Sequence, residues 1–100
     1  MVRKRDGALE PFVLDKVVAG VGKAIADRDV SLEEIERLTA EVERYAHDHG
    51  PVVPSEEIGQ VVLRHLRSID EIIYLRFASV HKGFTGASDF EREMAALDDE

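Results

Sequence analysis

The residues best suited to chemistry lie near the start of the chain, where Arg3-Lys4-Arg5 are followed by Asp6-Gly7. An Asp-Gly pair between two short extended segments predicts a β-hairpin with a two-residue type I′ turn, because Gly accepts positive φ freely and Asp tolerates it. Three cations on so short a ribbon, followed by a helix, would form a compact site for an anion. The alternative is a solvated edge strand whose charged side chains prevent aggregation.

The predicted turn also sets the register of the hairpin. The expected pairs are Arg5 with Ala8, Lys4 with Leu9 and Arg3 with Glu10. Because side chains alternate along a strand, one face would carry Val2, Lys4 and Leu9, and the other Arg3, Arg5 and Glu10.

Helical patterns fill the rest of the chain. Apolar residues at i, i+3, i+4 and i+7 spacing predict a first helix over residues 14–26. Three more helices are predicted, from the capping box Ser31/Glu34 to Gly50-Pro51, from an N-cap at Ser55 to Ile69, and from Asp70 to Phe84. The predicted fold class is α+β: an N-terminal β-hairpin packed on a bundle of four helices, with a short fifth helix at the C-terminus.

The two C-terminal helices carry apolar seams. Ile73, Phe77, Val80 and Phe84 are expected along one face of the fourth helix, and Phe90, Met94 and Leu97 form the seam of the fifth, which opens at a capping box of Ser88 and Glu91. Thr85-Gly86-Ala87 is the candidate hinge, so the predicted division is a domain over residues 1–84 and a hinge with an amphipathic helix over residues 85–100. A helix of about ten residues is marginal alone and must dock on its own body or on a neighbour.

Composition indicates one small domain. The 100 residues include 44% hydrophobic residues, enough for one modest core. No apolar run approaches the length of a membrane span, and the charged start is unlike a signal peptide, so the expectation is a cytoplasmic protein without membrane contact. The chain has no cysteine, which excludes disulfides, thiolate metal sites and cysteine nucleophiles.

Charge is distributed unevenly along the chain. Residues 1–28 contain six Lys/Arg and four Asp/Glu, a net charge of +2, whereas residues 29–100 contain seven and seventeen, a net charge of −10. Nucleic-acid-binding modules usually present a basic surface, so independent DNA binding is not expected. A small basic pole on an acidic body suits a small polyphosphate; the alternative is that the acidic body serves solubility alone.

Catalytic patterns are weak in this sequence. Ala19-Gly20-Val21-Gly22-Lys23-Ala24 is only a partial match to a P-loop, since Val17 stands where the first glycine belongs and no Ser or Thr follows Lys23. No pair of carboxylates lies on one helix face near the basic pole, and the four histidines form no convincing metal site. The prediction is therefore binding without hydrolysis, and no enzyme activity.

Tyr74, Phe77 and His81 share one edge of the predicted fourth helix, because they are spaced by three and four residues. This edge could offer an adenine base a flat surface and a polar contact. The alternative is that the aromatic residues belong to the core.

Two segments resemble the ATP-cone, a nucleotide-sensing regulatory domain. The first is Val2-x-Lys4-Arg5-Asp6-Gly7 with Glu10-Pro11-Phe12 and Asp15-Lys16, which resembles the opening of the domain. The second, Tyr74-Leu75-Arg76-Phe77-Ala78-Ser79-Val80-His81-Lys82-Gly83-Phe84, resembles its last core helix. The form is closest to the cone of NrdR-type repressors of ribonucleotide reductase genes. The pattern runs from Val2 to about Phe84, with a repressor-like tail from Ser88.

The resemblance implies ATP and dATP as ligands, with Mg²⁺ bound through the nucleotide, and control of oligomeric state. It implies a nucleotide site made of Val2 in the pocket wall, Lys4, Arg5 and Lys16 at the phosphates, Glu10 near the nucleotide, Ser55 as a hydroxyl contact, and His81 at the base. Helical spacing adds Tyr74 and Phe77 to the predicted base contact. Gly59 departs from the reductase-type cone, where a histidine can stand, and this puts a second nucleotide contact there in doubt.

NrdR-type repressors carry a zinc ribbon with four cysteines ahead of the cone, and this sequence has none. The alternatives are an excised domain, or a cone that stands alone or works with a separate effector or DNA-binding partner. Two other classes remain open: an N-terminal regulatory fragment of ribonucleotide reductase itself, and a helical interaction module without nucleotide binding. The expected assembly is a homo-oligomer whose size depends on the bound nucleotide.

Overall fold

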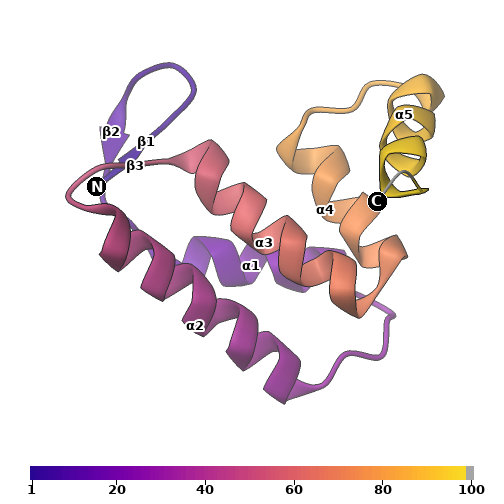
Figure 1. Ribbon diagram of the computed structural model, residues 1–100, viewed down its shortest axis with the longest axis horizontal. Coiled ribbons are helices and arrows are strands. Elements are labelled where there is room, and N and C mark those ends of the chain that lie inside the picture. Colours follow the sequence, from indigo (N-terminus) through magenta and orange to yellow (C-terminus); the bar gives the residue numbers. More distant parts are fainter. Residues whose placement is uncertain (99–100) are drawn as a thin grey trace.

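The computed structural model describes residues 1–98, which form a small sheet and five helices (Figure 1). The elements in chain order are β1 (Val2–Arg3), β2 (Leu9–Glu10), α1 (Leu14–Ala24), α2 (Leu32–His49), β3 (Val53–Pro54), α3 (Ser55–Ile69), α4 (Glu71–His81) and α5 (Ala87–Asp98). The predicted α+β fold class, with its hairpin, four helices and short fifth helix, is confirmed.

A third strand completes the sheet, and the sequence patterns did not predict it. β1 lies in the middle, antiparallel to β2 and parallel to β3, with Val2 opposite Val53 and Arg3 opposite Pro54. The Val53 amide donates to the Met1 carbonyl at 3.0 Å. A two-residue strand that ends at a proline carries almost no alternation signal, so only its place beside β1 identifies it.

The hairpin turn differs from the prediction. Arg3 lies opposite Leu9, and the Lys4 amide donates to the Ala8 carbonyl at 2.9 Å, so the loop has three residues. Gly7 has φ of 88°, whereas Asp6 keeps negative φ and its Oδ1 accepts from the Ala8 amide at 2.9 Å. The Asp side chain thus stabilises a three-residue loop in which the glycine alone adopts the left-handed conformation.

The register predicted for the hairpin is therefore wrong by one residue. Val2 lies opposite Glu10, and alternation places Lys4 on the same face as both. The correction matters because Lys4 and Glu10, which the two-residue turn would have separated, come together.

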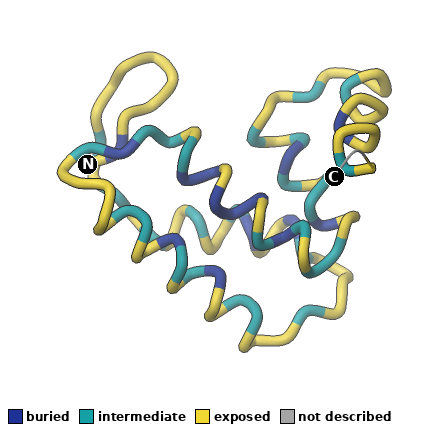
Figure 2. The backbone as a smooth tube through the Cα atoms, in the orientation of Figure 1, coloured by how far each residue is buried: buried dark blue, intermediate teal, exposed yellow. Residues whose placement is uncertain are grey.

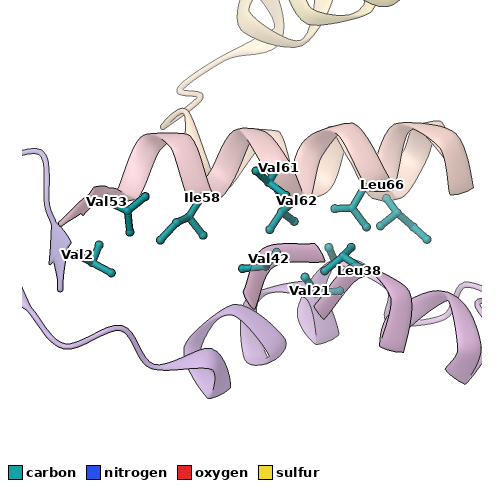
Figure 3. Close-up of a cluster of buried hydrophobic side chains, with 11 residues drawn as sticks. Val2, Val21, Leu38, Val42, Val53, Ile58, Val61, Val62 and Leu66 are labelled. Atoms are coloured by element: carbon teal, nitrogen blue, oxygen red, sulfur yellow. The ribbon is translucent and has the colours of Figure 1, made fainter. Parts of the chain in front are cut away.

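The core lies between α2, α3 and α1, and extends to the sheet (Figure 3). Val2 and Val53 approach Ile58 at the start of α3, while Leu38 and Val42 of α2 face the middle of α3. α3 contributes most to the core, as its dark stretch in Figure 2 shows, through Ile58, Val61, Val62, Leu63 and Leu66. Burial of this stripe holds the helix that forms one wall of the site described below.

The helices start as predicted at Ser31 and Asp70, two of the four positions expected from the sequence. Ser31 accepts from the Glu34 amide at 3.2 Å, and Asp70 accepts from the Ile72 and Ile73 amides at 2.7 and 3.2 Å. Ser55 is the first helical residue of α3 instead of its cap, because Pro54 occupies the N-cap position. α5 begins one residue before Ser88, and Asp89 accepts from the Thr85 and Gly86 amides at 2.8 and 3.3 Å.

The predicted seams of the last two helices are only partly buried. Ile73 is fully buried, but Val80 is 84% exposed. On α5, Phe90 and Met94 are only partly buried, at 37% and 44% exposure, while Glu93 is buried. Glu93 Oε1 lies 2.6 Å from Lys82 Nζ, so an ion pair and an edge-on contact of Phe84 with Phe90 dock α5 on its own chain.

Candidate functional site

A cavity of about 590 Å³ opens between the hairpin, α1, α3 and α4; it is called the main cavity below. Its wall combines the strand residues Val2 and Glu10, the segment 11–13, Lys16, Val17, Gly20, Lys23 and Ala24 of α1, Ser55, Ile58, Gly59 and Val62 of α3, and Arg76, Phe77, Ser79, Val80 and His81 of α4. The volume is within the range of small-molecule sites. Most of the lining is apolar, so polar recognition must come from the few charged residues around it.

The aromatic wall of the main cavity comes from one helix. Phe77 and His81 lie one turn apart on α4, with ring centroids 6.0 Å apart and planes tilted by 27°. The pKa of His81 is lowered, first by burial and then by the nearby Arg5 guanidinium. A neutral imidazole stacked beside a phenyl ring offers a flat, uncharged surface to an aromatic ligand.

Two cations, Lys4 of the hairpin and Lys16 of α1, lie close to Glu10. Lys16 Nζ lies 3.5 Å from Glu10 Oε1 and Lys4 Nζ lies 3.9 Å from Glu10 Oε2. Both lysine side chains are more than half exposed, so these pairs contribute little to stability. The pairs place two exposed cations beside the cavity wall; Lys4 and Lys16 are called the rim cations below.

Arg5 has a different role from the rim cations. Its guanidinium donates to the backbone carbonyl of His81, linking the hairpin loop to the end of α4. Neither Arg5 nor Lys4 lines the main cavity itself. The structure therefore brings Lys16 and Glu10 directly into the wall, and places Lys4 and Arg5 next to it.

Two cavity cations were missed by sequence reasoning. Lys23 lies two turns after Lys16, and Gly20 lies between them, so all three share one face of α1 at i, i+4, i+7 spacing. That spacing could have been read from the sequence. Arg76 donates to the carbonyls of Ala24 and Ala26, at 3.3 and 2.7 Å, and no short motif signals this contact.

Tyr74 is the predicted site residue that the structure places elsewhere. Its hydroxyl donates to Glu93 Oε2 at 3.4 Å, and burial followed by the Glu93 carboxylate raises the pKa of Tyr74. It packs against the core and toward α5, away from the cavity lining. Val2, Ser55, Phe77 and His81, by contrast, meet in one wall.

Over residues 1–98, no group of three or more His, Asp or Glu side chains is arranged to hold a metal ion. None of the helices in the same range is long and apolar enough to cross a membrane.

Comparison with known proteins matches residues 1–86 to the family described as the ATP cone domain. The chain belongs to the ATP-cone family. The resemblance noted in the hairpin and in the last core helix is thereby confirmed over most of the chain. The cone is a regulatory and not a catalytic domain, in agreement with the prediction that the chain is not an enzyme.

Similar curated proteins carry the name Transcriptional repressor NrdR. That of Mycobacteroides abscessus is 50% identical over 97 residues, covering 96% of this chain and 63% of the relative. That of Corynebacterium jeikeium is 47% identical over 98 residues (97% and 60%), and that of Nocardia farcinica 45% over 97 residues (96% and 62%). The chain thus spans somewhat under two thirds of the length of these relatives.

Proposed function

We propose that this domain senses ATP and dATP, and that the nucleotide binds in the main cavity. The observation that carries the proposal is the combination of an uncharged aromatic wall, Phe77 and His81, with the rim cations beside the same cavity. A nucleotide has the matching halves, a flat base and a compact polyanion. The domain's membership in the ATP-cone family supports the same ligand class.

The phosphate end of the ligand would meet the rim cations. Lys4 and Lys16 are held by Glu10 in loose pairs of 3.9 and 3.5 Å, which a phosphate can replace with shorter charge-assisted bonds. Lys23 extends the cationic edge along α1. Mg²⁺ would enter with the nucleotide and be held through phosphate oxygens and water, since Mg²⁺ commonly binds proteins in that way.

Calorimetric titration of the chain with ATP and with dATP, each with and without Mg²⁺, tests this function. Saturable binding that is weakened about tenfold or more in Lys16→Met but kept in Arg37→Met, an exposed α2 control, supports it. Absence of saturable heat with every nucleotide would favour the alternative of a helical interaction module.

A further part of the proposal is that the bound nucleotide sets the oligomeric state. Supporting it, Phe90 and Met94 of α5 and Ile72 of α4 are 37%, 44% and 45% exposed, which leaves apolar surface near the docked helix. Light scattering of ligand-free, ATP-bound and dATP-bound samples at matched concentrations checks this. Identical masses over a wide range of protein concentration would contradict a switch in assembly.

The regulatory output proposed for the domain is control of ribonucleotide reductase genes. The names of the similar proteins support this over the alternative of a reductase fragment. A chain with a net charge of −8 is a poor DNA ligand by itself, so DNA contact would come from another segment or a partner. An electrophoretic mobility assay with this chain alone should show no shift of duplex DNA at physiological salt.

A further inference from the structure

Gly59 lies in the middle of α3, in the wall of the main cavity, and faces the imidazole ring of His81. A Cβ atom placed on Gly59 would overlap this ring, and the three nearest atoms it would meet are Cε1, Nε2 and Nδ1 of His81. No real side chain tolerates such an overlap, so the ring can occupy its present place only because residue 59 is a glycine.

The Cε1–Nε2 edge of the ring is turned toward Gly59 of α3. Its Nε2 has no solvent contact and no hydrogen-bond partner among residues 1–98. The ring also stacks with Phe77, at a centroid distance of 6.0 Å, and the backbone carbonyl of His81 accepts a hydrogen bond from Arg5. Because Arg5 holds the backbone of His81, a side chain at position 59 would displace the imidazole ring away from α3 and would not move α4 as a whole.

A His81 ring displaced from α3 would move into the main cavity, because Gly59, Phe77 and His81 all line that cavity. A glycine here is otherwise unfavourable, since Ala stabilises a helix interior relative to Gly. Gly59 is therefore explained by the space it leaves for the ring.

We propose that Gly59 is a positioning residue that retracts His81 against α3 and so keeps the main cavity open for the nucleoside part of the ligand. The inference rests on the proposed nucleotide site and deepens it. Gly59 needs no contact with the phosphates, which belong to the rim cations. Substitution at position 59 should thus impair nucleoside binding through the imidazole, and removal of the imidazole should cancel the effect.

The test uses Gly59→Ala, His81→Ala and the double variant, titrated with ATP and with inorganic tripolyphosphate, with Tm measured for each. In the His81 background, Gly59→Ala should weaken ATP binding by about tenfold or more, the usual effect of overpacking a filled space. Tripolyphosphate affinity should stay within about twofold, because its contacts would be with the rim cations alone. His81→Ala should itself weaken ATP binding, and in that background Gly59→Ala should cause no further loss of ATP affinity relative to His81→Ala alone and should raise Tm.

Unchanged ATP affinity in folded Gly59→Ala would overturn the inference while leaving the nucleotide site intact. Failure of the wild-type chain to bind ATP would instead contradict the proposed function on which the inference rests. If Gly59→Ala alone does not fold, the double variant decides. A double variant that folds at least as stably as His81→Ala supports the inference that Gly59 makes room for the His81 ring, and a double variant that is also unfolded overturns it.

Discussion

The two ends of the molecule use charged residues in opposite ways. At the hairpin end, Lys4 and Lys16 are more than half exposed and lie 3.9 and 3.5 Å from Glu10. Helix α5 lies on the side of Figure 1 away from the hairpin. Glu93 of α5 lies 2.6 Å from Lys82, and its side chain is only 8% exposed. One arrangement is loose and open to solvent, and the other is short and enclosed.

The enclosed Lys82–Glu93 pair is suited to docking α5 on the chain, whereas the exposed pairs around Glu10 are suited to exchange with a ligand. A buried carboxylate needs its partner, because an unpaired buried charge is strongly unfavourable. An exposed pair contributes little to stability and can exchange its partner for a ligand phosphate. His81 and Lys82 are adjacent, so the end of α4 contacts the main cavity with one residue and α5 with the next.

The largest expected effect is the loss of α5 docking when the Lys82–Glu93 pair is broken. Glu93→Ala should destabilise the docking of α5 by about 2–3 kcal/mol, since Lys82 and the Tyr74 hydroxyl both lose their partner. Hydrogen exchange of the α5 amides measures this. Glu91→Ala, an exposed change on the same helix, is the matched control. Equal protection in both variants would show that the pair does not hold α5.

The rim cations should show the reverse pattern. Lys4→Ala and Lys16→Ala should each weaken ATP binding by about 1.5–3 kcal/mol, the range for a lost charge-assisted contact, and change the free energy of unfolding by less than about 0.5 kcal/mol. Calorimetry and urea denaturation measure the two quantities. A variant with normal affinity would place its lysine outside the site.

The hairpin loop should respond to backbone strain. Gly7 has φ of 88°, so Gly7→Val should destabilise the hairpin by about 1–2 kcal/mol, whereas Gly7→Asn should be tolerated better. Amide exchange at Lys4 and Ala8 reports on the loop. If both variants match the wild type, the left-handed conformation at Gly7 is not required.

The smallest expected effect is a loss of folding stability at low pH through Asp70. The Arg28 guanidinium and then the Ile73 and Ile72 amides hold the pKa of Asp70 below its usual range. Because the pKa of Asp70 is lowered in the folded state, its ionised carboxylate contributes fully to the free energy of unfolding above about pH 4. This contribution is lost as the pH falls through the lowered pKa. Thermal melts between pH 2 and 6 check this. Asp70→Asn should flatten part of the profile, and an unchanged profile would contradict it.

Local signals in the sequence predicted most of the fold. The helix starts at Ser31 and Asp70 depend on residues two or three positions apart, and both are confirmed. The hairpin register was wrong because Asp6 can stabilise two kinds of turn. β3 was missed because its pairing with β1 joins residues about fifty positions apart.

The candidate site was less accessible from the sequence. Lys16 and Phe77 could be placed by family resemblance and helical spacing, and both line the main cavity. Arg76 and the contact between Gly59 and His81 depend on how α1, α3 and α4 pack, which no local pattern encodes. Tyr74 shares a helix edge with Phe77 but turns to α5, since Glu93 supplies its hydroxyl with a partner.

The most direct test of a nucleotide site in the main cavity is an ATP titration followed by amide NMR shifts of the labelled chain. The account predicts saturable shifts clustered in residues 2–24, 55–62 and 76–81, with the outer face of α2 unaffected. Saturable shifts confined to α2, or none at all, would contradict it.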